Sequence, residues 1–247
     1  MKPSEPVLTA HGAARSRHSQ ATPAGPFAIR LHEGGGTPGN MPRFTYDGGM
    51  LEQRIQQHFF DAADLNYQVA ELLARPILHA TDALLGAITS GGKVFVGGVG
   101  AAAALAEVLT THLAGQMERE RPALPVLSLG GAASFLSASA SSSGGPDCWS
   151  RSLQALGQPG DLLVLLDAGA DPVPLAVAID SAREKDMAVL LLCGRSAPGL
   201  VERLLDTDVL ISVPHDRPAR ILEMQLLVIH ALCDGLDALL LGEEESE

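Results

Sequence analysis

The sequence contains few cysteines and few aromatic residues. Only three of its 247 residues are cysteines, Cys148, Cys193 and Cys233, and their wide spacing matches neither a zinc site nor a disulfide framework. We interpret them as buried thiols in a reducing cytoplasm. The aromatic content of 4%, beside a hydrophobic content of 46%, is typical of helices packed on a sheet of aliphatic strands.

Positive charge is also scarce, since 17 basic residues face 29 acidic ones and the net charge is −12. An acidic protein is repelled by the phosphate backbone, so we expect no direct binding to nucleic acid, and any role there would require a protein partner. No window approaches the 18 or more uncharged apolar residues of a membrane span, and the N-terminus lacks the apolar core of a signal peptide. We therefore expect a cytoplasmic protein that does not contact the membrane.

Residues 1–49 show no sustained hydrophobic period and are rich in proline, glycine, serine and threonine. We expect a disordered extension. The helical hydrophobic period begins at Met50. Two interpretations of residues 1–49 therefore stay open: they are a genuine disordered tail, or Met50 is the true start codon. The expected organisation is this extension, one folded domain over residues 50–242 and an acidic tail over residues 243–247.

Apolar residues recur at steps of three and four from Leu51 to Leu73, which predicts a long amphipathic helix. Pro76 is expected to interrupt it, with a second helix running to about Ser90. Further helices are predicted over residues 101–117, 132–140, 147–156, 172–185, 197–205 and 218–241.

Short apolar runs alternate with these helices. They predict strands over residues 93–97, 125–129, 162–167, 188–193 and 209–213. Runs such as "LLVLL" and "AVLLLC" are uniformly apolar, as in strands buried on both faces. The pattern predicts an α/β fold of the flavodoxin-like kind, a three-layer α/β/α sandwich with a parallel sheet of about five strands and long N-terminal helices.

A glycine turn follows the first predicted strand in "GGKVFVGGVGAAAALAE". Residues 98–103 fit the loose dinucleotide-binding pattern GxGxxG/A. A nicotinamide site would also need an acid at the end of the second strand, to accept hydrogen bonds from the ribose. That strand, in "PVLSLGG", ends without one, so the dinucleotide interpretation is not favoured.

Taken together, "GGKVFVGGVGAAAALAE", "RERPALPVLSL", "ALGQPGDLLVLL" and "AREKDMAVLLLCG" resemble the sugar isomerase (SIS) domain of the phosphoheptose isomerases and of DiaA, the protein that binds the replication initiator DnaA. The resemblance runs from Met50 to about Leu241. The closing segment "ARILEMQLLVIHALCDGLD" looks closer to DiaA. Membership of this family implies dimers paired into tetramers.

The resemblance also implies where a sugar phosphate would be held. The family's first turn reads Gly-Asn-Gly-Gly-Ser and its phosphate loop reads Ser-Thr-Ser-Gly-Asn-Ser. The matching ligand-binding positions here are Gly98, Val99, Gly100, Ala101, Ala102, Asp167, Ala168, Gly169, Ala170, Asp171 and Pro172. Most hydroxyl donors are lost and two acids are added, and both changes weaken the binding of a phosphate.

The resemblance places the isomerases' catalytic residues, a His and a Glu on one helix and a Gln and a His on the last, at Val108, His112, Leu222 and His230. Only His230 agrees. A neutral imidazole at His112 can in principle accept a proton or bind metal, but two histidines without a carboxylate make a poor zinc site. We interpret both as structural and expect no metal and no cofactor, with zinc required only if the protein is an active isomerase.

Three further polar features have two interpretations each. Glu107 is off the matching register and is expected on a solvated face. Asp167 and Asp171 fit either a cation site or loop carboxylates that are solvated or cap the next helix. The serine-rich loop 137–149, with Ser141 and Ser142 at the family's Asn-Asp positions, is expected to be flexible, although its hydroxyls offer an alternative ligand site.

The expected function is therefore a non-catalytic, carbohydrate-derivative-type binding scaffold that assembles as a dimer or tetramer. Its expected partners are the replication initiator or a related SIS subunit. The alternative is a sedoheptulose 7-phosphate isomerase, which interconverts an aldose and a ketose through an enediol.

Overall fold

The computed structural model describes residues 48–131 and 148–242 of the chain. The extension 1–49 lies almost entirely outside these ranges, and so do the serine-rich loop with Ser141 and Ser142, the helix predicted over residues 132–140 and the tail 243–247. All described residues belong to one unit, Asp47–Glu247.

Five parallel strands form the central sheet, in the order β2-β1-β3-β4-β5. Their bounds are β1 Val94–Gly98, β2 Val126–Ser128, β3 Leu162–Leu166, β4 Ala188–Gly194 and β5 Val209–Val213. Every residue of β3 and all but the first residue of β4 are buried, as their uniformly apolar sequences predict, and β1 is also buried throughout. The predicted parallel sheet is confirmed.

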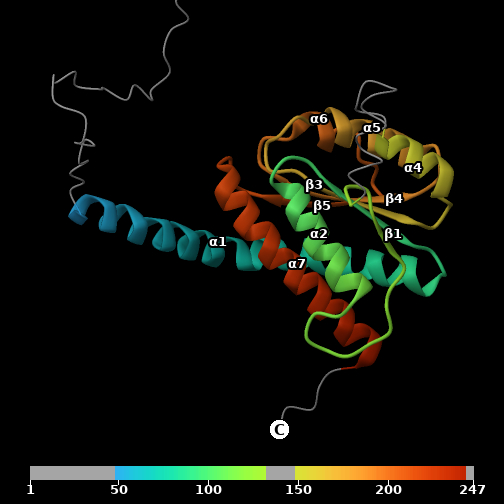
Figure 1. The fold of residues 1–247 in the computed structure, drawn as a ribbon, viewed down its shortest axis with the longest axis horizontal. Coiled ribbons are helices and arrows are strands. Elements are labelled where there is room, and N and C mark those ends of the chain that lie inside the picture. The colour runs from blue at the N-terminus through green and yellow to red at the C-terminus, as the bar shows by residue number, and fades with distance from the viewer. Residues whose placement is uncertain (1–47, 132–147, 243–247) are drawn as a thin grey trace, which may run out of the picture. The chain divides into compact units, whose positions relative to one another are not determined.

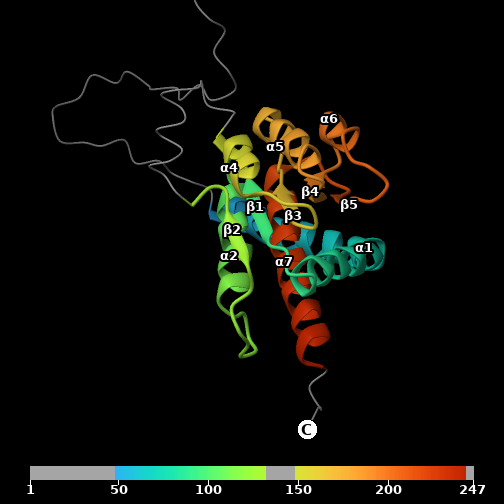
Figure 2. The same cartoon turned by 90° about the vertical axis from the view of Figure 1, so that its right-hand side faces the viewer.

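Helices cover both faces of this sheet (Figures 1 and 2). One face carries α1 Gly48–Thr89, α2 Ala102–Ala114 and α7 Pro218–Leu241. The other carries α4 Cys148–Leu156, α5 Val173–Arg183 and the short α6 Pro198–Val201. The three-layer sandwich is therefore confirmed, with α6 shorter than predicted.

Each layer boundary has its own hydrophobic core. Leu162, Val164 and Leu166 of β3 join the cluster that packs against α1, α2 and α7. The intervening Leu163 and Leu165 join the cluster under α4, α5 and α6. The alternation follows from the two-residue period of a strand, and it explains why β3 must be apolar at every position.

The break expected at Pro76 is wrong, because α1 continues through it as one helix of 42 residues. Proline removes the N–H that would donate to the carbonyl of Leu72. Leu72 is 55% exposed, so water can reach this side of the helix and solvate the carbonyl. Pro76 itself is half-buried, and the local sequence does not show that the carbonyl of Leu72 lies on a side of the helix that water can reach.

Among the described helices, α7 is long and apolar enough to cross a membrane by length and composition, which the sequence expectation missed. In the fold, 44% of its apolar window is buried, and the helix packs against α1 and α2. Its apolar composition is accounted for by this core position.

The chain leaves β1 toward β2 on one side, whereas β3 pairs with β1 on the other. In open parallel sheets, ligands bind outside the carboxyl ends of the strands at such a reversal. The crevice beyond β1 and β3 is therefore where the fold itself places a candidate site.

Candidate functional site

The loops that follow β1 and β3 meet in this crevice. Gly98 pairs with Leu166 in the sheet, so both loops start at the same level. A Cβ atom at Gly100 would lie 3.3 Å from the methyl group of Ala170. The structure thus brings together the two segments that the sequence marked as ligand-binding.

The turn after β1 offers little to a ligand. A Cβ at Gly98 would lie 2.5 Å from the carbonyl oxygen of Ala102, and Gly100 has φ +59°, so both positions require glycine. The N–H groups of Ala102 and Ala103 donate to the carbonyls of Val99 and Gly100, at 3.2 Å each. Ala102 itself is fully buried. The turn is therefore held by its own backbone hydrogen bonds, and its side chains are apolar.

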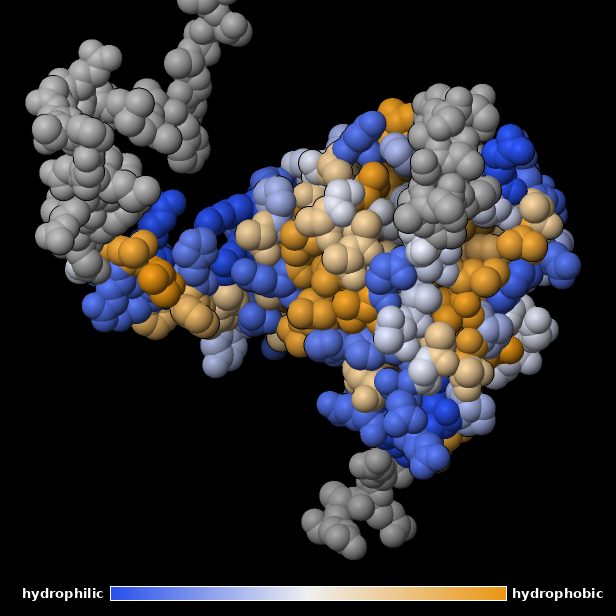
Figure 3. Space-filling view, in the orientation of Figure 1, coloured by the Kyte–Doolittle hydropathy of each residue, from blue (hydrophilic) through white to orange (hydrophobic). Residues whose placement is uncertain are grey.

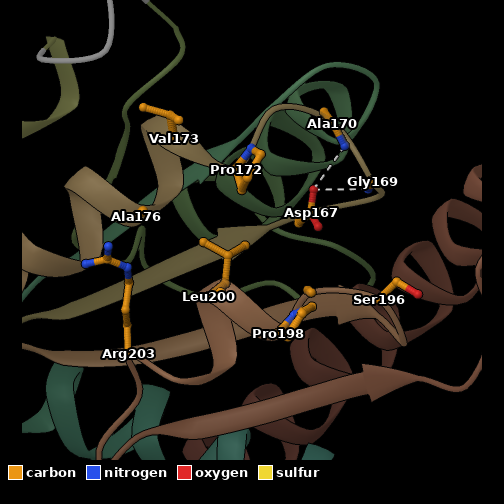
Figure 4. A pocket seen from close by; sticks show the side chains of 12 residues that line it. Asp167, Gly169, Ala170, Pro172, Val173, Ala176, Ser196, Pro198, Leu200 and Arg203 are labelled. Atoms are coloured by element: carbon orange, nitrogen blue, oxygen red, sulfur yellow. Dashed lines mark hydrogen bonds between the residues drawn. The ribbon is translucent and has the colours of Figure 1, made fainter.

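The side chain of Asp167 binds the backbone of the loop that follows β3. Its Oδ1 accepts hydrogen bonds from the N–H groups of Gly169 at 3.0 Å and Ala170 at 3.2 Å (Figure 4). Gly169 has φ +88°, a conformation suited to glycine that helps direct these N–H groups inward. Successive backbone N–H groups in a loop of this kind form an anion-binding concavity. Here the chain's own carboxylate fills it.

The second acid of the loop acts in the same way. Asp171 Oδ1 accepts a hydrogen bond from the N–H of Val173, at 3.1 Å. Pro172 has no N–H to donate. Asp171 therefore binds the first residue of α5, as a capping carboxylate does, whereas Asp167 satisfies N–H groups within the loop. Asp167 is only 4% exposed, so of the alternatives given for it, a solvated loop carboxylate does not apply.

Asp167 rests on a buried glutamine that the sequence analysis missed. Gln225 of α7 is fully buried, and its Nε2 donates to the carbonyls of Asp167 at 2.7 Å and Leu192 at 3.1 Å. The helix α7 carries several other polar residues, so the sequence pattern does not single out Gln225. Beside it, burial and the Asp167 charge raise the pKa of Cys193 to about 12, so this thiol stays protonated.

His112 and His230 are brought together by the packing of α2 on α7. Their ring centroids lie 5.8 Å apart, with an angle of 66° between the rings. His112 is half-buried and His230 is exposed. Val108 and Leu222, at the other two catalytic positions, are half-buried and pack against the apolar core.

A catalytic metal does not fit these residues. Two imidazoles supply two ligands, and a catalytic zinc site needs about three protein ligands. Within residues 48–131 and 148–242, no group of three or more His, Cys, Asp or Glu side chains is arranged to hold a metal ion.

An ion pair that the sequence analysis missed holds the two histidine-bearing helices together. Arg121 Nε donates to the carboxylate of Asp237 on α7 at 2.6 Å, and both side chains are almost fully buried. The η nitrogens of Arg121 donate to the carbonyls of Leu113 at 3.0 Å and His112 at 2.7 Å. Arg121 therefore caps α2 and fixes the backbone of His112.

The sequence analysis expected Glu107 on a solvated face, and this expectation is wrong. Glu107 is half-buried where α2 lies along β2, and it accepts a hydrogen bond from the hydroxyl of Ser128. Ser128 Oγ in turn accepts from the N–H of Gly130 at 3.1 Å. Glu107 thus stabilises the end of β2.

Comparison with known proteins agrees with this fold. A family model described as SIS domain matches residues 57–194. A curated phosphoheptose isomerase from Methylibium petroleiphilum is 45% identical over 197 residues, covering 80% of this chain and 98% of the relative. A phosphoheptose isomerase from Bordetella avium is 36% identical over 195 residues, covering 79% of this chain and 99% of the relative.

Solved structures give the same result. The phosphoheptose isomerase GmhA from Neisseria gonorrhoeae superposes with a TM-score of 0.72 at 32% identity, covering 76% of this chain and 99% of the other. A phosphoheptose isomerase from Francisella tularensis superposes with a TM-score of 0.73 at 29% identity, covering 76% and 98%. The predicted α/β fold is that of these proteins.

Proposed function

Since the chain belongs to the SIS-domain family of the phosphoheptose isomerases, we propose that it is a non-catalytic member of that family, which acts through protein partners. The named relatives carry the name of the enzyme, so the proposal rests on how this chain's own residues differ from what the chemistry requires. Binding of a sugar phosphate and proton transfer are each impaired, for separate reasons.

One observation carries the proposal: the carboxylate of Asp167 occupies the backbone N–H groups of the phosphate loop. A phosphate would have to displace this carboxylate and then lie beside its charge. At about 4 Å and an effective dielectric constant near 20, one like charge opposes binding by about 4 kcal/mol. The fold of the family persists while its anion site is filled from within.

The catalytic positions support the same conclusion. Aldose–ketose isomerisation through an enediol needs a base that removes a proton next to the carbonyl group. Val108 and Leu222 supply neither a base nor a metal ligand, which leaves His112 and His230 alone. We therefore expect turnover of sedoheptulose 7-phosphate to be undetectable, with or without added zinc.

A coupled isomerase assay tests this expectation. The protein is assayed at high enzyme concentration with sedoheptulose 7-phosphate, beside an active phosphoheptose isomerase as the positive control. Absence of turnover supports the proposal. Measurable turnover that His230→Ala abolishes would overturn it.

Partner binding has a surface available on α1. Phe59, Phe60 and Tyr67 are 72%, 62% and 84% exposed. The N-terminal half of α1 extends beyond the other elements of the folded unit, and apolar residues gather along it and over the face that α7 crosses (Figures 1 and 3). Exposed apolar area on this scale marks an interaction surface.

Self-association is the first use we expect for this surface. We predict a dimer or tetramer in light scattering at micromolar concentration, and a lower mass for the variant Phe59→Glu/Phe60→Glu, because the charges would lie in the interface. Ser90→Glu, at an exposed position near the end of α1, is the matched control and should leave the mass unchanged. A monomeric unmodified protein would refute this prediction.

Beyond self-association, we propose the replication initiator or a related SIS subunit as the partner, in the cytoplasm. The acidic composition is consistent with a role that reaches nucleic acid only through another protein. Recovery of such a protein with the tagged chain, and its loss with the Phe59→Glu/Phe60→Glu variant, would support this assignment.

The second candidate, an active sedoheptulose 7-phosphate isomerase, is favoured by the contact between His112 and His230 at 5.8 Å. Under that alternative, a neutral imidazole accepts the proton, because it is the only side chain at the four catalytic positions able to do so. Sugar phosphate would then bind despite Asp167. The assay above separates the two candidates.

A further inference from the structure

A pocket of about 520 Å³ lies between α5 and α6, at the carboxyl ends of β3 and β4 (Figure 4). This volume is in the range of small-molecule sites. Its lining comes from the loop 167–172, from α5 and from residues 196–203, and the turn 98–102 contributes none of its described lining residues. The pocket therefore shares the loop 167–172 with the crevice and extends from it toward α5 and α6.

The walls of the pocket are mainly apolar. Figure 4 shows Asp167 and Ser196 at one side and Arg203 at the other, with Pro172, Pro198 and Leu200 between them. Ala176 of α5 also lines the space. These side chains suit a compact hydrocarbon body and offer it no hydrogen bond.

Asp167 is the polar group of the pocket that is not fully used. Its side chain is 96% buried, from an exposure of 4%, and Oδ1 accepts the two loop N–H groups. Among the described residues, none donates a hydrogen bond or an ion pair to Oδ2. Oδ2 is not one of the fully buried polar atoms that lack a partner among the described residues, so it is open to the pocket, where a donor from a bound molecule would add a charge-assisted hydrogen bond.

The other polar groups in the lining do not balance this charge. Arg203 Nη1 is bound to both carboxylate oxygens of Asp180, at 2.6 Å each. The Ser196 hydroxyl donates to Asp216 at 2.5 Å. Asp171, in the same loop, adds a further negative charge. The electrostatics of the pocket therefore select a cation that carries N–H donors.

We propose that this pocket binds a small organic ammonium ion, with the ammonium group on Asp167 Oδ2 and an aliphatic body against Pro172, Ala176 and Leu200. Charge complementarity supplies the orientation, and the apolar walls supply the contact area. The site uses the carboxylate oxygen that the loop N–H groups leave free. It rests on the proposed function, because both need the Asp167 carboxylate on the N–H groups of the loop.

Isothermal titration with three probes of one shape tests the proposal: cyclohexylmethylamine, cyclohexylmethanol and cyclohexanecarboxylate. The amine is expected to bind about tenfold or more tightly than the alcohol, and the carboxylate not to bind. Amide chemical shifts of Gly169, Ala170 and Gly199 should move with the amine.

Asp167→Asn is the decisive variant, because an asparagine oxygen can still accept the two loop N–H groups while the charge is removed. It should reduce binding of the amine to the level of the alcohol. Asp206→Asn makes the same charge change at an exposed position outside the lining and should leave amine binding unchanged.

Thermal unfolding of each variant checks that the fold is retained. Equal binding of amine and alcohol, amine binding that survives Asp167→Asn, or no binding of the amine to the unmodified protein would each overturn the proposal. An equal loss with Asp206→Asn would also overturn it, because the effect would then come from net charge.

Discussion

Replacing Asp237 with alanine is expected to lower the free energy of unfolding by about 3–5 kcal/mol. The change leaves the guanidinium of Arg121 buried without its counter-ion, while its η nitrogens still bind the end of α2. An uncompensated buried charge is costly because the interior solvates it poorly. Urea unfolding at fixed protein concentration, followed by circular dichroism, measures the change.

The Arg203–Asp180 pair provides the matched control. Its side chains are 42% and 56% exposed, so Asp180→Ala should cost only about 0–1 kcal/mol. The double variant Arg121→Met/Asp237→Leu removes both buried charges and should restore most of the stability lost by Asp237→Ala. A loss below about 1 kcal/mol for Asp237→Ala would show that the pair is not a buried anchor.

Replacing Asp167 with serine and Asp171 with asparagine is expected to raise the affinity for sedoheptulose 7-phosphate by about 100-fold or more. The variant removes two negative charges and frees the N–H groups of Gly169 and Ala170. Gly169 is retained because its φ of +88° would strain another residue. Isothermal titration of both proteins gives the ratio.

Two controls separate the causes of this gain. Asp167→Asn keeps an oxygen on the loop N–H groups and should give a smaller gain. Glu202→Gln/Asp206→Asn removes two exposed charges outside the loop and should change the affinity little. All variants should remain inactive, since Val108 and Leu222 are unchanged. Equal affinity of the loop variant and the unmodified protein would contradict the role given to Asp167.

The fold was predictable from the sequence because its strands are short aliphatic runs. Buried residues at every position of β1 and β3 correspond to "VFVGG" and "LLVLL", a pattern that only a sheet covered on both faces accommodates. Pro76 was misjudged because its effect depends on which side of α1 faces water. That property comes from tertiary packing.

The position of the candidate site was predictable from the sequence, but the hydrogen bonds of its residues were predictable only in part. Family resemblance located the two loops, and the sheet register does bring them together. Which donors Asp167 and Glu107 would satisfy depends on loop conformation and on the packing of α2 along β2, neither of which a linear pattern contains. Arg121 and Asp237 are 116 residues apart, so their pairing arises only in the folded chain.

The proposed non-catalytic function requires a phosphate loop that is stable without a ligand. The carboxylates of Asp167 and Asp171 accept hydrogen bonds from the N–H groups of Gly169, Ala170 and Val173, so these donors are satisfied without a ligand. The scaffold then remains available for contacts with other proteins.

The most direct test of this account is isothermal titration of sedoheptulose 7-phosphate into the unmodified protein, beside an active phosphoheptose isomerase. The account predicts no saturable heat for this protein at concentrations that saturate the enzyme, because the loop N–H groups are occupied by Asp167. Saturable binding with an affinity close to that of the enzyme would contradict it and would assign the chain to the sugar-phosphate-binding members of its family.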